Sequence, residues 1–269
     1  MLEDLTFIIP VRVESQDRQE NALVTLSHLC KYFKSNIIIL EEDTNPKIPS
    51  ILDTIAVNDM RINYHFLPSS EDVFHRTKFL NMMLRMVTTS VVVNYDIDVL
   101  LLPHVYEKCY NLIKSGQDLV YPYFFGWSWL PIFPPERKKL LSGTQFESLE
   151  FPTRYNSQYG FCQFFNTKSY IEGGMENEGF VSFAPEDRER GYRFQKLGYK
   201  VMWSDDFVYH LEHGRGVNSD QRNPMFKRNE ELFEYIKTLS VEELRAYYSA
   251  SPADQVLGLR SPITSVQLG

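Results

Sequence analysis

The sequence predicts an α/β protein with a doubly wound, mostly parallel sheet and helices on both faces. Strand-like and helix-like segments alternate from residue 5 to residue 122. A strand, a helix and a second strand within about forty residues form a unit whose strands lie parallel. The apolar run at 91–93 is β-branched, which is typical of a strand buried on both faces of such a sheet. A length of 269 residues allows a sizeable core.

The first half divides into elements with distinct patterns. Leu23, Leu26 and Leu29 recur near helical spacing, and Gly116 gives a C-terminal stop to the helix before it. We expect strands over 5–11, 36–40, 62–67, 91–93 and 118–122, helices over 21–33, 77–86 and 104–114, and a polar loop over 12–18.

The second half has a different composition. Residues 123–129 are dense in aromatic side chains, and the charged stretch 133–152 predicts an excursion on the surface. We expect strands over 161–165, 200–203 and 205–209, helices over 167–172 and 190–197, and one or two amphipathic helices over 229–249. Nothing resembles a linker, so we predict one domain over 1–250, followed by a weakly ordered tail over 251–269.

Charge and cysteine usage exclude several classes of protein. With 28 Lys and Arg against 35 Asp and Glu, the net charge of −7 argues against a nucleic-acid partner and a broad anionic-membrane footprint. Cys30, Cys109 and Cys162 are too scattered for a disulfide framework or a zinc knuckle. An acidic N-terminus does not resemble a signal peptide, and no apolar run approaches the roughly 20 residues of a transmembrane segment. We therefore predict a cytoplasmic protein whose membrane contact, if any, would be peripheral.

Two carboxylates follow the strand predicted at 91–93. Asp96 and Asp98 are one residue apart, and ligands of open α/β sheets bind beyond the carboxyl ends of the strands. Such a pair can hold a hard divalent cation and present it to phosphate oxygens. Aspartates that merely end a strand or form a turn are common, so the pair needs partners elsewhere in the chain.

Two histidines supply a candidate partner. His210 and His213 come just after a short strand, and Gly214 and Gly216 favour a turn that would let both imidazoles converge on one metal. A lone histidine is more often structural. No His-Glu-x-x-His helix is present, which argues against a zinc hydrolase.

Four further charged residues allow both a structural and a functional interpretation. Glu186 and Asp187 stand near a helix start, where an acid often serves as a cap, although either could act as a general base. Arg12 follows the first strand and Arg76 opens a helix; both could be solvated surface charge or phosphate ligands. The chain has no glycine-rich phosphate loop, so a metal and arginines would have to bind a phosphate.

Taken in order, these motifs resemble the metal-dependent GT-A glycosyltransferases, most closely the β-1,4-galactosyltransferase family. The resemblance consists of five short segments distributed between residue 5 and residue 228, and the sequence between them does not match. Its segments are Pro10-Val11-Arg12, Phe74-His75-Arg76-Thr77-Lys78, Asp96-Ile97-Asp98, Glu186-Asp187 and His210-Leu211-Glu212-His213.

The resemblance implies a GT-A fold and a role for each motif. Asp98, His210 and His213 would bind Mn²⁺, or Mg²⁺, which is less suited to imidazole ligands. Asp187 would be the base, and Glu186 would orient the acceptor. The UDP-sugar would contact Pro10, Val11, Arg12, Phe74, Arg76, Asp96 and Ile97. Outside the resemblance, we add Glu42 as a residue that could accept a hydrogen bond from uracil.

Departures from the family pattern are concentrated around the acceptor side. Ala184-Pro185 replaces a Gly-Gly pair, Arg188 replaces a third acid, and Phe183 stands where the family has a tryptophan that stacks on the acceptor. Glu186-Asp187 followed by Gly191-Tyr192-Arg193-Phe194 is also similar to GT-A domains of bacterial polysaccharide synthesis. This second similarity adds UDP-GalNAc, UDP-GlcNAc and UDP-glucuronate to galactose as candidate donors.

We therefore predict an inverting, metal-dependent transfer of a sugar, galactose first, from a UDP-sugar to a hydroxyl of a glycan or glycolipid acceptor. Residues 1–122 would form the nucleotide-sugar half, 123–228 the acceptor and metal half, and 229–250 the C-terminal helices. Aromatic residues in 123–129 and 161–165 could stack on sugars or lie in the core. The alternatives are a sugar nucleotidyltransferase, disfavoured because 11–18 has no glycine, and a non-catalytic nucleotide-sugar-binding module.

Overall fold

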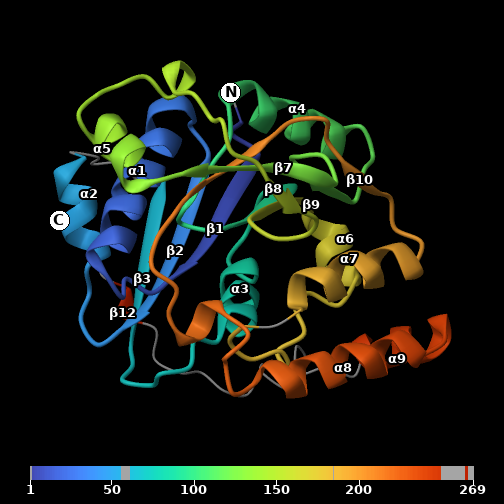
Figure 1. Ribbon diagram of the computed structural model, residues 1–269. Helices are drawn as coiled ribbons and strands as arrows, with labels where there is room; N and C mark the ends of the chain where they lie inside the picture. The colour runs from blue at the N-terminus through green and yellow to red at the C-terminus, as the bar shows by residue number, and fades with distance from the viewer. Residues whose placement is uncertain (1, 56–60, 184, 250–263, 266–269) are drawn as a thin grey trace.

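The computed structural model describes residues 2–55, 61–183, 185–249 and 264–265, and it is organised around an eight-stranded sheet (Figure 1). In spatial order the strands are β10 (Val201–Trp203), β6 (Leu119–Tyr121), β9 (Cys162–Asn166), β4 (Val91–Tyr95), β1 (Leu5–Val11), β2 (Asn36–Asp43), β3 (Ile62–Pro68) and β12 (Thr264–Ser265). The strands β1, β2, β3 and β4 are parallel, whereas β9 runs antiparallel to both β4 and β6. The predicted α/β architecture is confirmed.

The winding of this sheet reverses at β1. The chain passes from β1 to β2 and β3 on one side and then returns to place β4 on the other side of β1. The carboxyl ends of β1 and β4 therefore meet at a topological switch point, where open α/β sheets bind ligands. Arg12 and Asp96 directly follow these two strands.

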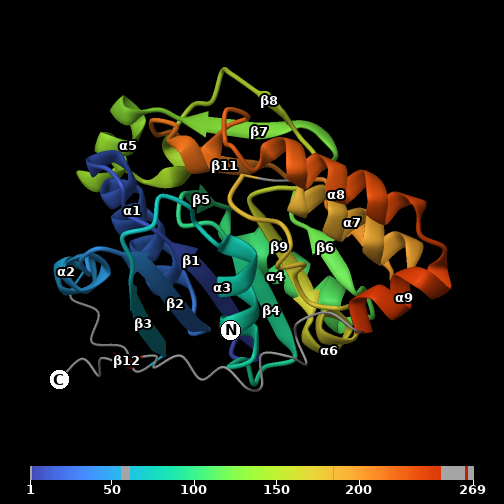
Figure 2. The ribbon, with the colours of Figure 1, turned by 90° about the horizontal axis from the view of Figure 1, so that it is seen from below.

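Helices gather at the two ends of the sheet (Figures 1 and 2). One group is α1 (Gln16–Tyr32), α2 (Ile48–Thr54) and α5 (Pro134–Leu141); the other is α6 (Thr167–Glu172), α7 (Glu186–Lys196), α8 (Phe226–Thr238) and α9 (Val241–Ser249). Between them, α3 (Arg76–Leu84) packs on β1 and β2, and α4 (Pro103–Lys114) packs on β6 and β9. Within the described ranges, we find no helix whose length and apolarity would suffice to cross a bilayer.

Two helices, α1 and α7, begin several residues before their predicted starts. Helix α1 begins at Gln16, five residues before the predicted start, because Ser15 caps it by accepting a hydrogen bond from the Arg18 amide. The predicted loop 12–18 is thus partly helical. Helix α7 begins at Glu186 and not at residue 190. The one or two helices predicted over 229–249 are two, α8 and α9, and α8 begins at Phe226. The tail predicted over 251–269 lies outside the described residues, apart from Thr264–Ser265.

A second sheet was not predicted from the sequence. It consists of β5 (Val99–Leu100), β11 (Val208–Leu211), β7 (Gly126–Ile132) and β8 (Tyr155–Ser157), in that order. Gly126 and Pro131 weaken the strand pattern of β7, and β5 is too short to be recognised. Pairing of β11 with β5 sets His210 opposite Val99, one residue after Asp98.

The charged stretch 133–152 is not simply an excursion on the surface. Its helix α5 carries Arg137, whose side chain is 1% exposed. The guanidinium donates to Glu20 Oε2 at 2.9 Å, to Asn21 Oδ1 at 3.0 Å and to the Glu212 carbonyl at 2.8 Å. Arg137 thereby ties α5 to α1 and to the backbone next to His213.

Arg137→Met should lower the free energy of unfolding by about 1–3 kcal/mol, because the buried Asn21 oxygen and the Glu212 carbonyl lose their donor. Urea unfolding followed by circular dichroism measures the change. Lys139→Ala is the control in the same helix: its side chain is 59% exposed, so its effect should stay within about 0.5 kcal/mol. Equal stability of the two variants would contradict the role given to Arg137.

Candidate functional site

A cleft of about 280 Å³ lies at the carboxyl ends of β1 and β4. Every site residue predicted from the sequence lines this cleft except Glu42. They come from segments far apart in the chain: Pro10, Val11, Arg12, Phe74, Arg76, Asp96, Ile97, Asp98, Glu186, Asp187, His210 and His213.

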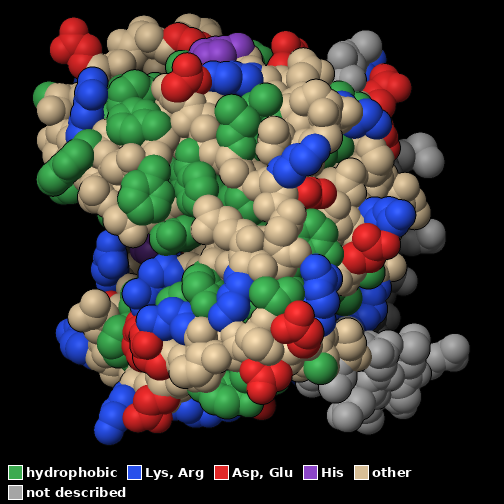
Figure 3. Space-filling model, turned by 90° about the vertical axis from the view of Figure 1, so that its right-hand side faces the viewer, with side chains coloured by type: hydrophobic (Ala, Val, Ile, Leu, Met, Phe, Trp, Pro, Cys, Tyr) green, Lys and Arg blue, Asp and Glu red, His purple; other side chains and the backbone are tan. Residues whose placement is uncertain are grey.

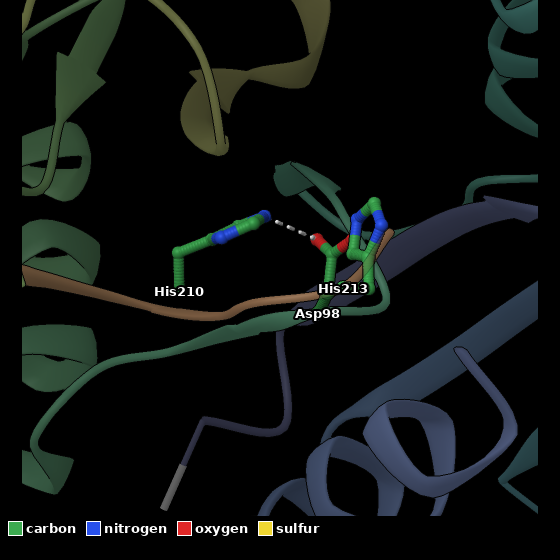
Figure 4. A group of neighbouring side chains, drawn as sticks. All are labelled: Asp98, His210 and His213. Atoms are coloured by element: carbon green, nitrogen blue, oxygen red, sulfur yellow. Dashed lines mark hydrogen bonds and ion pairs between the residues drawn. The ribbon is translucent and has the colours of Figure 1, made fainter. Parts of the chain in front are cut away.

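Asp98, His210 and His213 form a group that could hold a metal (Figure 4). His213 Nε2 lies 3.0 Å from Asp98 Oδ2, and His210 Nε2 lies 3.6 Å from Asp98 Oδ1. One ligand atom from each residue falls within 4.8 Å of the others. The carboxylate comes from the turn after β4, and the imidazoles come from β11 and the loop that follows it.

The other ring nitrogens show how the histidines are oriented. His210 Nδ1 lies 3.0 Å from Glu212 Oε1, and His213 Nδ1 lies 2.8 Å from the Gly214 carbonyl. An acceptor at each Nδ1 favours the Nδ1–H tautomer of the neutral imidazole, in which each Nε2 would be available to a metal held between the rings and Asp98. Where no metal is bound, His213 Nε2 can donate to Asp98 Oδ2 at 3.0 Å. One carboxylate and two such imidazoles fit a transition-metal ion such as Mn²⁺.

The two aspartates of the 96–98 segment have opposite environments. Burial raises the pKa of Asp98, but the adjacent His210, His213 and Arg18 outweigh it and hold that pKa well below its usual range. For Asp96, burial dominates over the Arg76 charge, so its pKa is raised. Arg76 Nη2 lies 2.7 Å from Asp96 Oδ1, so Asp96 pairs with an arginine while Asp98 faces the histidines.

Arg76 also links Asp96 to the acids of α7. Its Nη1 lies 3.6 Å from Glu186 Oε1 and 3.6 Å from Asp187 Oδ1. Burial, reinforced by the Asp187 charge, raises the pKa of Glu186 to about 8. Among the described residues, Arg76 Nη1 and Glu186 Oε2 are buried and have no hydrogen-bond partner. Unsatisfied buried groups and shifted pKa values are typical of functional sites.

A buried arginine fixes the position of Asp187. Arg190, fully buried, donates from Nε and Nη2 to the two Glu176 oxygens at 2.6 Å each. Its Nη1 donates to Asp187 Oδ1 at 2.8 Å and to Gln163 Oε1 at 3.1 Å. The sequence analysis missed Arg190, although its position one helical turn after Asp187 places the two side chains on one face of α7.

Arg12 lines the cleft and forms an ion pair with Glu42, which lies outside the lining. Arg12 Nη2 lies 2.5 Å from Glu42 Oε2, and further donors of Arg12 reach the carbonyls of Asp72 and Val73 at 3.1 and 3.2 Å. The guanidinium also lies 5.4 Å from the centre of the Phe74 ring. Glu42 is 3% exposed and does not line the cleft, so the structure does not bring it to the ligand space as predicted.

Several lining residues were missed in the sequence. Arg18, placed by the early start of α1, has Nη1 3.9 Å from Asp98 Oδ2, and the capping signal at Ser15 could have revealed it. Asn218 ties two loops together: its Oδ1 accepts from the Phe74 amide at 3.1 Å and from Ser182 Oγ at 2.5 Å. No local pattern marks it. The other missed residues are Glu14, Ser182, Glu212, Arg215 and Ser219. Phe161 and Phe183, which the sequence analysis connected with sugar stacking, also line the cleft.

The fold of this chain is found in a solved structure, although no protein-family model matches its sequence. A search of curated proteins also finds no match. The structure is similar to that of the mannosyltransferase PcManGT from Pyrobaculum calidifontis, in complex with GDP-Man and Mn²⁺, with 15% identity and a TM-score of 0.58 over 96% of this chain and 70% of that one.

Two structures of Drosophila β1,4-galactosyltransferase 7 are also similar, each over 79% of this chain and 72% of theirs. The catalytic domain in complex with xylobiose has 14% sequence identity to this chain and a TM-score of 0.45. A mutant in complex with manganese, UDP-Gal and xylobiose has 13% sequence identity and a TM-score of 0.48.

The likeness to the mannosyltransferase confirms the predicted GT-A glycosyltransferase fold. At this level of identity the comparison shows the fold alone, so the chemistry has to be argued from the cleft.

The pKa of Glu186 predicts a pH dependence of stability. Between the ordinary value and about 8, the folded chain holds a proton that the unfolded chain has lost, so stability should fall as pH rises through this window. One such group gives a slope of up to about 1.4 kcal/mol per pH unit. Glu186→Gln should flatten the fall in unfolding free energy between about pH 5.5 and 8.

The matched control is Glu172→Gln, an exposed carboxylate on α6. It should keep the pH slope of the unaltered protein. A Glu186→Gln variant with that same slope would contradict the raised pKa.

Proposed function

We propose that this protein is a metal-dependent glycosyltransferase that moves a sugar from a nucleoside-diphosphate sugar to an acceptor hydroxyl with inversion. The observation that carries the proposal is the convergence of Asp98, His210 and His213, with both Nε2 atoms turned toward the carboxylate. Arginines and a second acidic pair line the same cleft. The GT-A fold supports it.

The donor would occupy the part of the cleft between β1 and α3. Pro10, Val11 and Phe74 offer an apolar wall for a nucleoside, with Arg12 held beside the Phe74 ring. Arg18 supplies positive charge near Asp98, where a diphosphate would lie, and Arg215 adds a second cation to the lining of the cleft. A metal bound by Asp98, His210 and His213 would neutralise the charge that develops on the leaving diphosphate. Asp96 and Ile97 would contact the ribose or the sugar.

The acids of α7 would act on the acceptor. Asp187 lies in the donor cleft and also lines the groove beside it, so an acceptor hydroxyl placed there can reach it. Arg190 holds one Asp187 oxygen, which restricts the carboxylate to a single orientation. We assign the general base to Asp187 and the orientation of the acceptor to Glu186.

Galactose from UDP-galactose is the first candidate, with UDP-GalNAc, UDP-GlcNAc and UDP-glucuronate as alternatives. The mannosyltransferase complex adds GDP-mannose. The acceptor would be a glycan or a glycolipid. Three scattered cysteines, which form no disulfide in the described structure, support the prediction of a cytoplasmic reaction.

A donor should stabilise the protein in a metal-dependent manner. A bound ligand at one hundred times its dissociation constant adds about 2.7 kcal/mol. We expect one of the five nucleotide sugars named above to raise the melting temperature, with a larger rise when Mn²⁺ is present. Asp98→Asn should lose the Mn²⁺-dependent part.

Asp205→Asn is the control, since the Asp205 side chain is 88% exposed and outside the metal group. Absence of stabilisation by every nucleotide sugar would count against the proposal. Stabilisation without Mn²⁺-dependent hydrolysis of any of these donors would instead favour a non-catalytic binding module.

Asp187→Asn should lower the transfer rate about 10²–10⁴-fold, because the amide cannot accept the proton of the attacking hydroxyl. Donor-dependent stabilisation should persist, which separates loss of the base from loss of the fold. Asp53→Asn, an exposed acid on α2, should keep the full rate. Near-normal transfer by Asp187→Asn would show that another group is the base.

A further inference from the structure

A second hollow adjoins the cleft and is larger than it. Its volume is about 840 Å³, and it shares Phe183 and Asp187 with the cleft. The volume lies toward the upper end of the roughly 300–1,000 Å³ typical of small-molecule sites. We call it the lateral groove, and its lining residues are Asn156, Gln158, Tyr159, Gly160, Phe183, Pro185, Asp187, Arg188, Gln221, Phe226 and Glu230.

Aromatic rings line the lateral groove and continue beyond it. Phe183 stacks on Phe226 with ring centres 5.9 Å apart. Tyr159 meets Phe125 at 5.8 Å and Trp203 at 5.9 Å, and Phe125 meets Trp203 at 5.6 Å. Phe125 is 51% exposed. An exposed aromatic cluster of this kind usually marks a binding surface.

The surface view supports this arrangement. Hydrophobic side chains gather on the upper part of the face that lies to the right in Figure 1, and below them the face is hollowed and bordered by charged side chains (Figure 3). The structure also separates the aromatic residues of 123–129: Tyr123 is fully buried, whereas Phe125 and Trp127 are 51% and 63% exposed.

The polar lining of the lateral groove combines three amide side chains with one ion pair and one further carboxylate. Asn156, Gln158 and Gln221 present exposed amides, which can both donate and accept hydrogen bonds. Arg188 forms an ion pair with Glu230, so its charge is matched. Asp187 is the remaining charged side chain of the lining.

This combination fits a carbohydrate. The C–H faces of sugar rings pack on aromatic side chains, and their hydroxyls need groups that both donate and accept hydrogen bonds. Matching the polar rim and the aromatic strip at once requires more than one sugar, because the strip continues from Tyr159 to Phe125 and Trp203.

We propose that the lateral groove binds a neutral glycan of two or more sugar units, with the reacting hydroxyl at Asp187 and the following sugars on Tyr159 and Phe125. The proposal rests on the transferase function proposed above and specifies its acceptor as an oligosaccharide. A single sugar would reach Asp187 but leave Phe125 uncovered.

Charge disfavours two other occupants. An acidic glycan would meet the Asp187 carboxylate, and the matched Arg188 offers it no unpaired cation. An anionic membrane surface would need unpaired lysines or arginines around the aromatic side chains, but Lys108 is paired with Asp205 and Asp206, which follow shortly after Trp203.

The test is binding of the full chain, with Mn²⁺ and UDP, to an array of immobilised neutral and acidic glycans, from single sugars to longer chains. We expect binding to neutral glycans of two or more units and weaker binding to their single sugars. Phe125→Ala should weaken binding about tenfold, corresponding to about 1.4 kcal/mol for one lost aromatic contact, and Phe125→Tyr should restore it.

Phe133→Ala is the matched control: Phe133 is 41% exposed, precedes α5 and does not line the lateral groove, so its removal should leave binding unchanged. Binding of acidic glycans only, equal binding of single sugars, or Phe125→Ala binding at full strength would overturn the proposal. Self-association that Phe125→Ala abolishes would assign the surface to a second copy and overturn it too.

The donor measurement separates the two proposals. If a nucleotide sugar and Mn²⁺ stabilise the unaltered protein but no glycan binds, the acceptor proposal fails while the transferase proposal stands. If no nucleotide sugar stabilises it, the transferase proposal fails first.

Discussion

The candidate site depends on one backbone pairing, that of β5 with β11. The Leu211 amide donates to the Asp98 carbonyl at 2.8 Å, and the register places His210 opposite Val99. This short ladder joins segments that are far apart in the chain and brings both imidazoles to Asp98. Arg137 supports the same loop from α5 by donating to the Glu212 carbonyl. The second sheet is therefore the element that completes the group around Asp98.

Buried charge is the second constraint on the cleft. An unpaired buried ion costs several kcal/mol, so each charged group here has an opposite partner. Arg190 is matched by Glu176 and Asp187, and Arg76 by Asp96. Glu186 also lies 3.6 Å from Arg76, but burial and the Asp187 charge raise its pKa to about 8, so it stays protonated at neutral pH. The acids of α7 thus lie close together without both being charged.

The order of elements in the first half could be read from the sequence because it depends on local patterns. Alternating apolar runs and helical periodicity predicted the parallel strands and most helices, and the residues predicted at their ends, apart from Glu42, line one cleft. Where a local signal was overlooked, the error was local too. The prediction did not use the helix cap at Ser15, so it began α1 too late and left Arg18 in a loop. Strand β7 and the buried Arg137 had no local signal, because their partners are distant in sequence.

By itself the sequence determined the α/β class, the acids after β4, the histidine pair and the acids of α7, because residue type and spacing carry that information. Only the tertiary structure decided how these residues combine. It paired Asp96 with Arg76 and Asp98 with the histidines, removed Glu42 from the cleft, and fixed Asp187 through Arg190. Each of these outcomes depends on distances across strands and helices that are remote in the chain, and such distances are set by the packing of the whole fold.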